Sequence, residues 1–415
     1  MRIPALAIVA FLMATPAAGA LGVLGVELVD LGNSGGRAIV GVEHDALGSV
    51  TQRLVGLGAN VLLSDEDLDI LVVSSNDLTG LLTSVLSIPG VTYTEKDDAT
   101  HTAGAQWNGA QWNGAQWNGA QWNGAQWNGN TSSDADPGLL WQWGLTATKA
   151  PLAWKAEGTS GASLCILDSG VAWDHPDLES NVDAGHGINL IDPTKSAYDD
   201  AGHGTHMAGV AAAQIGNGFG VAGVANADIL PVKVLKSDGT GTESDLAIGL
   251  AWCANHGAKV ALMALSVTDD GPTLRKAIQY AHDHDVLLVA SAGNGGCSDC
   301  VAYPARDKDV LAVGAVSQTL SRASFSSRGG QVDLAAPGVD ILGPFPGDKF
   351  VYGSGTSQAA AFVAGAAALV RGAHPELSAD AARARLEGHA RDIGVPGVDA
   401  SFGHGLLDVD AALGG

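Results

Sequence analysis

The chain has 415 residues, of which 46% are apolar, so it exceeds one typical domain and is able to bury a sizeable core. Its 44 acidic residues against 21 basic residues give a formal net charge of −23. Such a charge argues against nucleic acid or an anionic membrane surface as a partner, and it fits a solvated extracellular surface.

The first segment, residues 1–20, has the pattern of a secretory signal peptide. Arg2 precedes an apolar run at residues 5–13, and the small residues of Ala18-Gly19-Ala20 end the segment. The apolar run is too short for a membrane span, and no apolar run of about 20 residues follows it. We therefore expect a secreted protein with no membrane association after processing. A transmembrane signal anchor is the alternative.

The next segment, residues 21–98, contains the pattern of a small domain. From residue 36 onwards, strand and helix patterns alternate. The strand patterns lie at 36–44, at 59–75 as two strands around an acidic turn, and at 91–96, with helix patterns at 46–57 and 77–86. The order strand, helix, two strands, helix, strand is typical of a ferredoxin-like α+β domain.

A linker is predicted at residues 99–135, which contain five perfect copies of Ala-Gln-Trp-Asn-Gly at residues 105–129. A five-residue period fits neither a helix nor an alternating strand, and Asn-Gly is a strong turn signal, so we expect a flexible, turn-rich segment. The five tryptophans allow two interpretations: the segment contacts carbohydrate, or the repeat simply expanded in a linker that tolerates it. Asn130 begins a glycosylation sequon whose use the sequence leaves undecided.

Residues 136–415 read as a succession of short apolar strands and helices. The strand patterns lie at 163–169, 227–235, 259–267 and 286–294, and the helix patterns follow His203 and lie at 245–256, 273–284 and 378–387. Such alternation predicts an α/β fold with a mainly parallel sheet covered by helices on both faces. Catalytic groups then lie at the carboxyl ends of the strands.

Three stretches of this domain carry residues suited to nucleophilic catalysis. Ser357 lies where a glycine-marked turn enters an Ala-rich helix pattern, Asp168 ends a strand pattern, and His203 begins a helix pattern. A serine hydroxyl is a poor nucleophile unless a base and an orienting acid act on it. We assign these roles to His203 and Asp168. The structural alternatives are a helix cap, a helix start and a turn residue.

The sequences SLCILDSG, GHGTHMAG and GTSQAAAFVAG, in this order, resemble those of the subtilisin-like serine proteases, or subtilases. The resemblance covers residues 136–413 closely and 36–98 loosely. It implies a subtilisin-like three-layer α/β/α fold and a monomeric serine endopeptidase that cuts proteins or peptides through an acyl-enzyme. It also implies that residues 21–98 are an inhibitory propeptide, which the zymogen removes by self-cleavage. An unrelated small domain, and a catalytically weak or silent relative that binds protein or carbohydrate, are the alternatives.

The resemblance extends to the groups around the nucleophile. Asn294 matches the family's oxyanion asparagine, and the backbone N–H of Ser357 is the natural second donor. The walls and floor of the pocket for the residue before the scissile bond correspond to Ala264, Leu265, Ser266, Ser291, Ala292, Gly293 and Ala302. Because none of them is charged, we expect a preference for a medium-sized apolar side chain. Gln358, Ala361 and Phe362 depart from the family's usual methionine, proline and histidine, which predicts altered packing behind the nucleophile.

Calcium is the cofactor that the resemblance implies. Asp177 matches the family's carboxylate ligand, and Asn217 lies in the glycine-rich loop at residues 215–221 that matches the family's calcium loop. A hard cation with oxygen ligands suits such a loop. A turn without a metal is the alternative.

The chain has four cysteines. Cys297 and Cys300 would close a small ring in an oxidising compartment. We expect no zinc binding by this pair alone, because structural zinc normally takes four protein ligands. For Cys165 and Cys253, the sequence does not decide between buried free thiols and a second disulfide.

Overall fold

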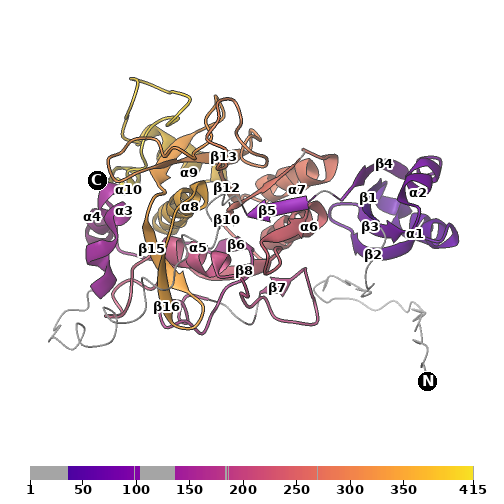
Figure 1. Ribbon diagram of the computed structural model, residues 1–415, viewed down its shortest axis with the longest axis horizontal. Coiled ribbons are helices and arrows are strands. Elements are labelled where there is room, and N and C mark those ends of the chain that lie inside the picture. The colour runs from indigo at the N-terminus through magenta and orange to yellow at the C-terminus, as the bar shows by residue number, and fades with distance from the viewer. Residues whose placement is uncertain are drawn as a thin grey trace.

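A computed structural model describes residues 36–97, 99–102, 136–182, 185, 187–268 and 270–414 of the chain. The predicted signal peptide, the tryptophan repeats and Asn130 lie outside these residues. Figure 1 shows a small N-terminal domain lying against one side of a larger domain.

The N-terminal domain has the predicted ferredoxin-like order. Its elements are β1 (Gly36–Val42), a 3-10 turn (His44–Ala46), α1 (Leu47–Gly56), β2 (Asn60–Asp65), β3 (Ile70–Ser75), α2 (Leu78–Val85) and β4 (Val91–Lys96). The strands pair antiparallel in the order β2-β3-β1-β4. The two helices cover one face, where Val40 packs with Val50 and Leu54. The opposite face, with Ile39 and Val72, packs against the larger domain.

The larger domain is built on a seven-stranded sheet in the order β14-β13-β12-β10-β6-β8-β7. Its strands are β6 (Leu164–Asp168), β7 (Ile188–Asn189), β8 (Ile229–Lys233), β10 (Val260–Met263), β12 (Leu287–Ser291), β13 (Val310–Val316) and β14 (Leu334–Pro337). Every neighbouring pair is parallel. The predicted parallel sheet is confirmed.

Helices cover both faces of this sheet. They are η2 (Pro137–Trp141), α3 (Trp143–Ala147), α4 (Ala150–Glu157), α5 (His203–Ala212), α6 (Glu243–Asn255), α7 (Pro272–Asp283), α8 (Thr356–Ala373), α9 (Ala379–Gly388) and α10 (Val409–Leu413). Successive strand residues face opposite sides: Ile166 packs in the core formed with α5 and α8, and Leu167 in the core formed with α6 and α7. Figure 1 shows the resulting order from α5 and α8, through the sheet, to α6, α7 and the N-terminal domain.

Smaller strands lie at the edges of these layers. They are β5 (Ala99–Thr102), β9 (Thr240–Thr242), β11 (Leu265–Val267), β15 (Ile341–Phe345) and β16 (Lys349–Gly353). The strand pattern at residues 259–267 is interrupted at Ala264, so it forms β10 and then β11. Among the residues that the structure describes, no helix combines the length and the hydropathy that crossing a bilayer requires.

The beginning of the predicted linker differs from the expectation. Residues 99–102 form β5, which is the middle strand of an antiparallel sheet in the order β11-β5-β9. The short sequence ATHT has no strand pattern of its own. It is extended because strands from two distant parts of the chain offer it hydrogen bonds on both edges.

Candidate active site

One strand and one helix bring the predicted acid and base together. Asp168 is the last residue of β6, and His203 is the first residue of α5. The His203 ring nitrogen Nδ1 lies 2.8 Å from both carboxylate oxygens of Asp168. Both side chains are only 1% exposed. An Nδ1–H bond to a buried carboxylate fixes the tautomer that leaves Nε2 as the basic nitrogen.

Ser357, the predicted nucleophile, lies in the first turn of α8. Its hydroxyl donates to the Ala264 carbonyl at 3.1 Å, at the junction between β10 and β11. The side chain is buried, as are those of Asp168 and His203. The nucleophile therefore lies beside the strand that borders β5.

Asn294 is held in an orientation that suits an oxyanion donor. Its Oδ1 accepts hydrogen bonds from the Thr356 backbone N–H at 2.9 Å and from the Thr356 hydroxyl at 3.1 Å. A Cβ added to Gly355 would lie 3.4 Å from Asn294 Nδ2 and 3.6 Å from the Ser357 nitrogen. The nearest atom to that position is Gln358 Oε1 at 2.8 Å, so the two predicted donors and this amide oxygen border the same space.

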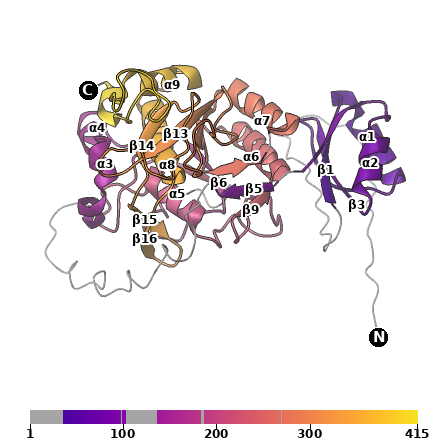
Figure 2. The ribbon, with the colours of Figure 1, turned by 45° about the horizontal axis from the view of Figure 1, so that its top comes forward.

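β5 lies between the edges of β11 and β9 beside these groups, and we call the space between these two edges the groove. Thr102 pairs with Leu265, His101 with Ser266, and Thr100 with Val267 on one edge. On the other edge β5 pairs with β9, and the Thr102 N–H donates to the Gly239 carbonyl at 3.0 Å. Figure 2 shows β5 beside β9 in the larger domain. An extended peptide in this groove gains main-chain hydrogen bonds on both edges.

The predicted pocket residues fall into two groups. Ala264, Leu265 and Ser266 form the β10–β11 edge that faces β5, while Ser291, Ala292 and Gly293 follow one another at the end of β12. Ala302 joins the second group, because its N–H donates to the Ala292 carbonyl at 2.9 Å. A Cβ on Gly293, whose φ is 99°, would lie 3.1 Å from the Ala302 Cβ.

Comparison with known proteins decides the family. A sequence model described as the subtilase family matches residues 159–405. The chain belongs to the subtilase family.

Named relatives and a solved structure agree with this assignment. The subtilase is 40% identical over 272 residues to Subtilisin BL from Lederbergia lenta, which covers 65% of this chain and 97% of that protein. It is also 40% identical over 272 residues to the Alkaline protease of Alkalihalobacillus alcalophilus, which covers 65% of this chain and 69% of that protein. The protein is therefore a subtilisin-like serine endopeptidase.

The structure of fervidolysin from Fervidobacterium pennivorans, described as a keratinolytic enzyme related to subtilisin, superposes with a TM-score of 0.75 at 26% identity. The match covers 94% of this chain and 62% of the fervidolysin chain, so the subtilase spans less than two thirds of that protein's length. This likeness supports the subtilisin-like fold.

The predicted calcium residues also lie together. The Asp177 carboxylate accepts hydrogen bonds from Asn217 Nδ2 at 3.0 Å and from the Val221 N–H at 2.8 Å. Burial, with Asp136 nearby, raises the pKa of Asp177 to about 7. Asp136, which we did not predict at this site, accepts from the N–H of Gly216. The Asn217 Oδ1 accepts from the Phe219 N–H at 2.8 Å, and both carboxylates accept backbone N–H groups. Carboxylate and amide oxygens are the ligand type that Ca²⁺ takes, but here the ion would have to replace these N–H donors.

The predicted Cys297–Cys300 disulfide is present, and so is a second disulfide between Cys165 and Cys253 that the sequence left undecided. Cys165 is on β6, three residues before Asp168, and the pair ties this strand to α6. Both residues are fully buried.

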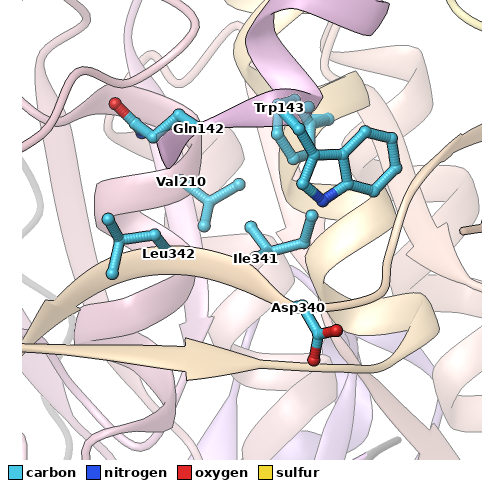
Figure 3. Close-up of a pocket in the computed structure, with 8 residues that line it drawn as sticks. Gln142, Trp143, Val210, Asp340, Ile341 and Leu342 are labelled. Atoms are coloured by element: carbon cyan, nitrogen blue, oxygen red, sulfur yellow. The ribbon is translucent and has the colours of Figure 1, made fainter. Parts of the chain in front are cut away.

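Phe362 and Gln358, two of the residues that differ from the family's usual residues behind the nucleophile, are both packed inside the domain. Phe362 lies on α8 against Gly144, where a Cβ would overlap the aromatic ring. Its ring helps line a small pocket with Gln142, Trp143, Gly144, Val210, Asp340, Ile341 and Leu342. Figure 3 shows this pocket, to which the predicted catalytic residues do not contribute. Gln358 is 2% exposed and, among the described residues, its Oε1 has no hydrogen-bond partner.

Sequence reasoning missed Asp199, a buried carboxylate whose partners are chain neighbours of the acid and the base. It accepts from the Ser169 hydroxyl at 2.8 Å and from the Thr205 hydroxyl at 2.6 Å. It also accepts from the Gly202 N–H at 2.8 Å, next to His203. Burial raises the pKa of Asp199. Its position before a glycine-marked helix start was a signal for a helix-capping carboxylate.

Proposed function

We propose that this subtilase is a secreted endopeptidase made as a self-cleaving zymogen, with Asp168, His203 and Ser357 as its catalytic triad. The observation that carries the proposal is β5, the segment following the N-terminal domain, paired in the groove beside Ser357. A substrate peptide would bind in the same way, as an added strand between β9 and β11.

Each residue then has a defined part in peptide hydrolysis. Rotation of the Ser357 side chain moves its hydroxyl from the Ala264 carbonyl to His203 Nε2, which takes the proton as the oxygen attacks the substrate carbonyl. His203 then protonates the leaving amine, while Asp168 stabilises the imidazolium. Water releases the acyl group by the same steps in reverse.

The negative charge on the tetrahedral intermediate is placed near two donors. Asn294 Nδ2 and the Ser357 N–H border the space beside Gly355. The loss of one such donor costs about a hundredfold to a thousandfold in kcat. Thr356 supports this role by holding the amide oxygen of Asn294 away from that space.

The contacts of the N-terminal domain support its role as an intramolecular inhibitor. Tyr93 donates to or accepts from the Thr273 hydroxyl at 2.8 Å, and Glu95 accepts from the Thr273 N–H at 3.1 Å. Both contacts lie at the start of α7. The domain thus docks through these polar contacts and through the apolar face with Ile39 and Val72, while β5 fills the groove. Activity therefore requires both a cut and dissociation of the domain.

Calcium completes the proposal as a structural cofactor. Asp177 and Asn217 would hold it, and the bound ion would neutralise a carboxylate that is otherwise buried beside Asp136. This assignment concerns stability and has no part in the hydrolytic steps.

Substitution of the nucleophile tests both self-processing and the triad. Purified Ser357→Ala should be a folded precursor of uncut length, because the substitution removes the group that releases the propeptide. Ser321→Ala, at an exposed serine, is the matched control and should mature. If Ser357→Ala matured to the normal size with no added protease, self-cleavage would be refuted.

Covalent labelling separates an active enzyme from a silent relative. Phenylmethylsulfonyl fluoride should abolish hydrolysis by the mature protein and modify Ser357, as read by peptide mass mapping. A folded mature protein that neither hydrolyses peptides nor takes up the label at Ser357 would contradict the proposed activity.

A further inference from the structure

The loop closed by Cys297 and Cys300 begins and ends at the catalytic centre. The chain leaves the sheet after Ser291, passes through the pocket wall to Asn294, and comes back beside Ala292 at Ala302. The two ends are joined by the bond from the Ala302 N–H to the Ala292 carbonyl.

A shift of the ring would reach the proposed oxyanion donor through Gly295 and Gly296, which donate to the Ser327 hydroxyl at 3.3 Å and to the Phe325 carbonyl at 2.7 Å. It would reach the pocket floor through the neighbouring Val301.

The outer part of the loop has little core to hold it. Cys297, Ser298 and Asp299 are exposed, and Cys300 is half-buried. The backbone enters the left-handed region twice, at Gly296 with φ 69° and at Asp299 with φ 54°. Glycine tolerates this region readily, but a non-glycine residue such as Asp299 adopts it less often.

One neighbouring residue supplies most of the non-covalent contacts of the ring. The Arg328 N–H donates to the Cys297 carbonyl at 3.1 Å, and the Cys300 N–H donates to the Arg328 carbonyl at 3.4 Å. The Arg328 side chain donates to the Ser298 hydroxyl at 2.8 Å, at an exposed position. Exposed hydrogen bonds exchange readily with water, so they hold the loop weakly.

The two disulfides of the protein differ in ways that predict different effects. Cys165 and Cys253 are separated by 88 residues and fully buried, whereas Cys297 and Cys300 are separated by three and lie at the surface. In the chain-entropy account, a long closed loop constrains the unfolded chain more than a short one. The surface ring is therefore suited to local positioning rather than to global stability.

We propose that the Cys297–Cys300 disulfide is a positioning element of the active site, which fixes Asn294 and Ala302 and whose opening lowers turnover reversibly. This inference rests on the proposed catalytic roles of the oxyanion donor and the pocket. The opening step is thiol–disulfide exchange with a small external thiol. Two thiols supply two electrons and two protons, the ring becomes two cysteine thiols, and the reductant leaves as its own disulfide.

The test compares the mature enzyme with its Cys297→Ser/Cys300→Ser variant on peptide anilides that differ in the side chain before the scissile bond. We expect kcat to fall by about tenfold, because displacing the oxyanion donor should cost only part of the rate that its removal costs. KM should change less than kcat. The preference between small and large side chains should also change, which a role in folding alone would not produce.

Ser298→Ala is the control, because it removes a side-chain contact of the same ring and keeps the disulfide. It should retain kcat and substrate preference. In the inactive Ser357→Ala precursor, loss of the ring should leave the melting temperature nearly unchanged. A double cysteine variant with unchanged kcat and preference would overturn the inference, and so would an equal loss in Ser298→Ala.

Chemical reduction provides a second route if the double variant fails to fold. A mild thiol applied to the native enzyme, followed by alkylation and peptide mapping, should label Cys297 and Cys300 and leave Cys165 and Cys253 unlabelled. Activity should fall with labelling of the ring, and reoxidation before alkylation should restore it. Full activity with the ring reduced would refute the inference, whereas a wild-type enzyme without activity would refute the proposed function instead.

Discussion

The Asp97 carboxylate caps α6 of the catalytic domain, accepting a hydrogen bond from the Ser244 N–H at 2.9 Å and another from the Ser244 hydroxyl at 2.8 Å. Arg37 Nε lies 2.7 Å from the same carboxylate and connects it to Asp245. An anion at a helix N-terminus satisfies backbone donors that have no partner within the helix. Asp97, a residue of the N-terminal domain, therefore caps a helix of the catalytic domain.

Removal of this cap should accelerate release of the propeptide. Asp97→Ala loses hydrogen bonds to a charged group, which are worth about 1.5–3 kcal/mol. The dissociation constant of the cleaved N-terminal domain from the catalytic domain should therefore rise by about tenfold to a hundredfold. The measurement is the delay between cleavage of the precursor and the appearance of peptidase activity on dilution.

Asp45→Ala is the control, since Asp45 is exposed on the 3-10 turn of the N-terminal domain. It should leave the delay unchanged. An Asp97→Ala precursor that cuts at the normal rate and shows the wild-type delay would contradict a role for this cap in inhibition.

His206 should make the fold sensitive to acid. Its Nε2 lies 3.1 Å from the Ile341 carbonyl oxygen, and full burial, with His203 nearby, lowers its pKa to about 4. In the unfolded chain a histidine has a pKa of about 6.5. Between these two values the unfolded state binds a proton that the folded state does not. This contribution to stability is fully present above pH 6.5 and is lost as the pH falls to about 4, a change of about 3 kcal/mol.

Urea unfolding of the Ser357→Ala precursor at several pH values between these limits measures the effect. With His206→Gln, the slope of unfolding free energy against pH should decrease by about one proton's worth, about 1.4 kcal/mol per pH unit. His389→Gln, at an exposed histidine, should leave the slope unchanged. Equal slopes in the parent and in His206→Gln would show that His206 is not the titrating group.

Calcium should raise the melting temperature of the precursor, because a ligand bound only by the folded state stabilises it by mass action. At a free concentration one hundred times Kd, the gain is about 2.7 kcal/mol. Asp177→Asn should abolish the difference between melting curves recorded in calcium and in chelator. Coincident curves for the parent protein would rule out the proposed site.

The sequence predicted the elements whose signals are local. The strand and helix patterns predicted the elements of the N-terminal domain, and in the larger sheet they predicted β6, β8, β10 and β12 but not β7, β13 or β14. Apolar periodicity is local, because it follows directly from which face is buried. The three motifs around Asp168, His203 and Ser357 gave the candidate site, since each lies at a strand end or a helix start. In the N-terminal domain, even β4 has the predicted bounds.

The features that the sequence did not reveal depend on distant partners. β5 has no apolar pattern and is a strand only because β9 and β11 flank it. The pairing of Cys165 with Cys253 depends on the packing of α6 against β6, and the proximity of Asp136 to Asp177 depends on the path of the segment before α3. Single-sequence patterns carry no information about such contacts, which the tertiary fold alone determines.

The position of β5 constrains where the precursor is cut. From sequence alone, we expect maturation between Asp98 and Asp136, in or beside the tryptophan repeat. In the structure, Thr102 pairs with Leu265, and the neighbouring Ala264 carbonyl accepts the Ser357 hydroxyl. The chain therefore runs toward the nucleophile, and in the proposed processing step residues 99–102 would lie on the acyl side of the bond that is cut. The first cut should fall just after Thr102, within the sequence Ala103-Gly104-Ala105, and not at Asp98.

Further cuts should follow from the repeat itself. Once the first bond is cut, residues 105–129 form a new N-terminal segment with five identical copies of one sequence. Identical copies offer identical sites to other enzyme molecules, so the mature N-terminus should become ragged in steps of five residues at longer times. Mass spectrometry of the N-terminal peptides, sampled from the start of activation, tests both statements. A unique early N-terminus at or before Thr102 would refute the predicted first cut. A single N-terminus at later times would be consistent with the first cut but would contradict the predicted further cuts in the repeat.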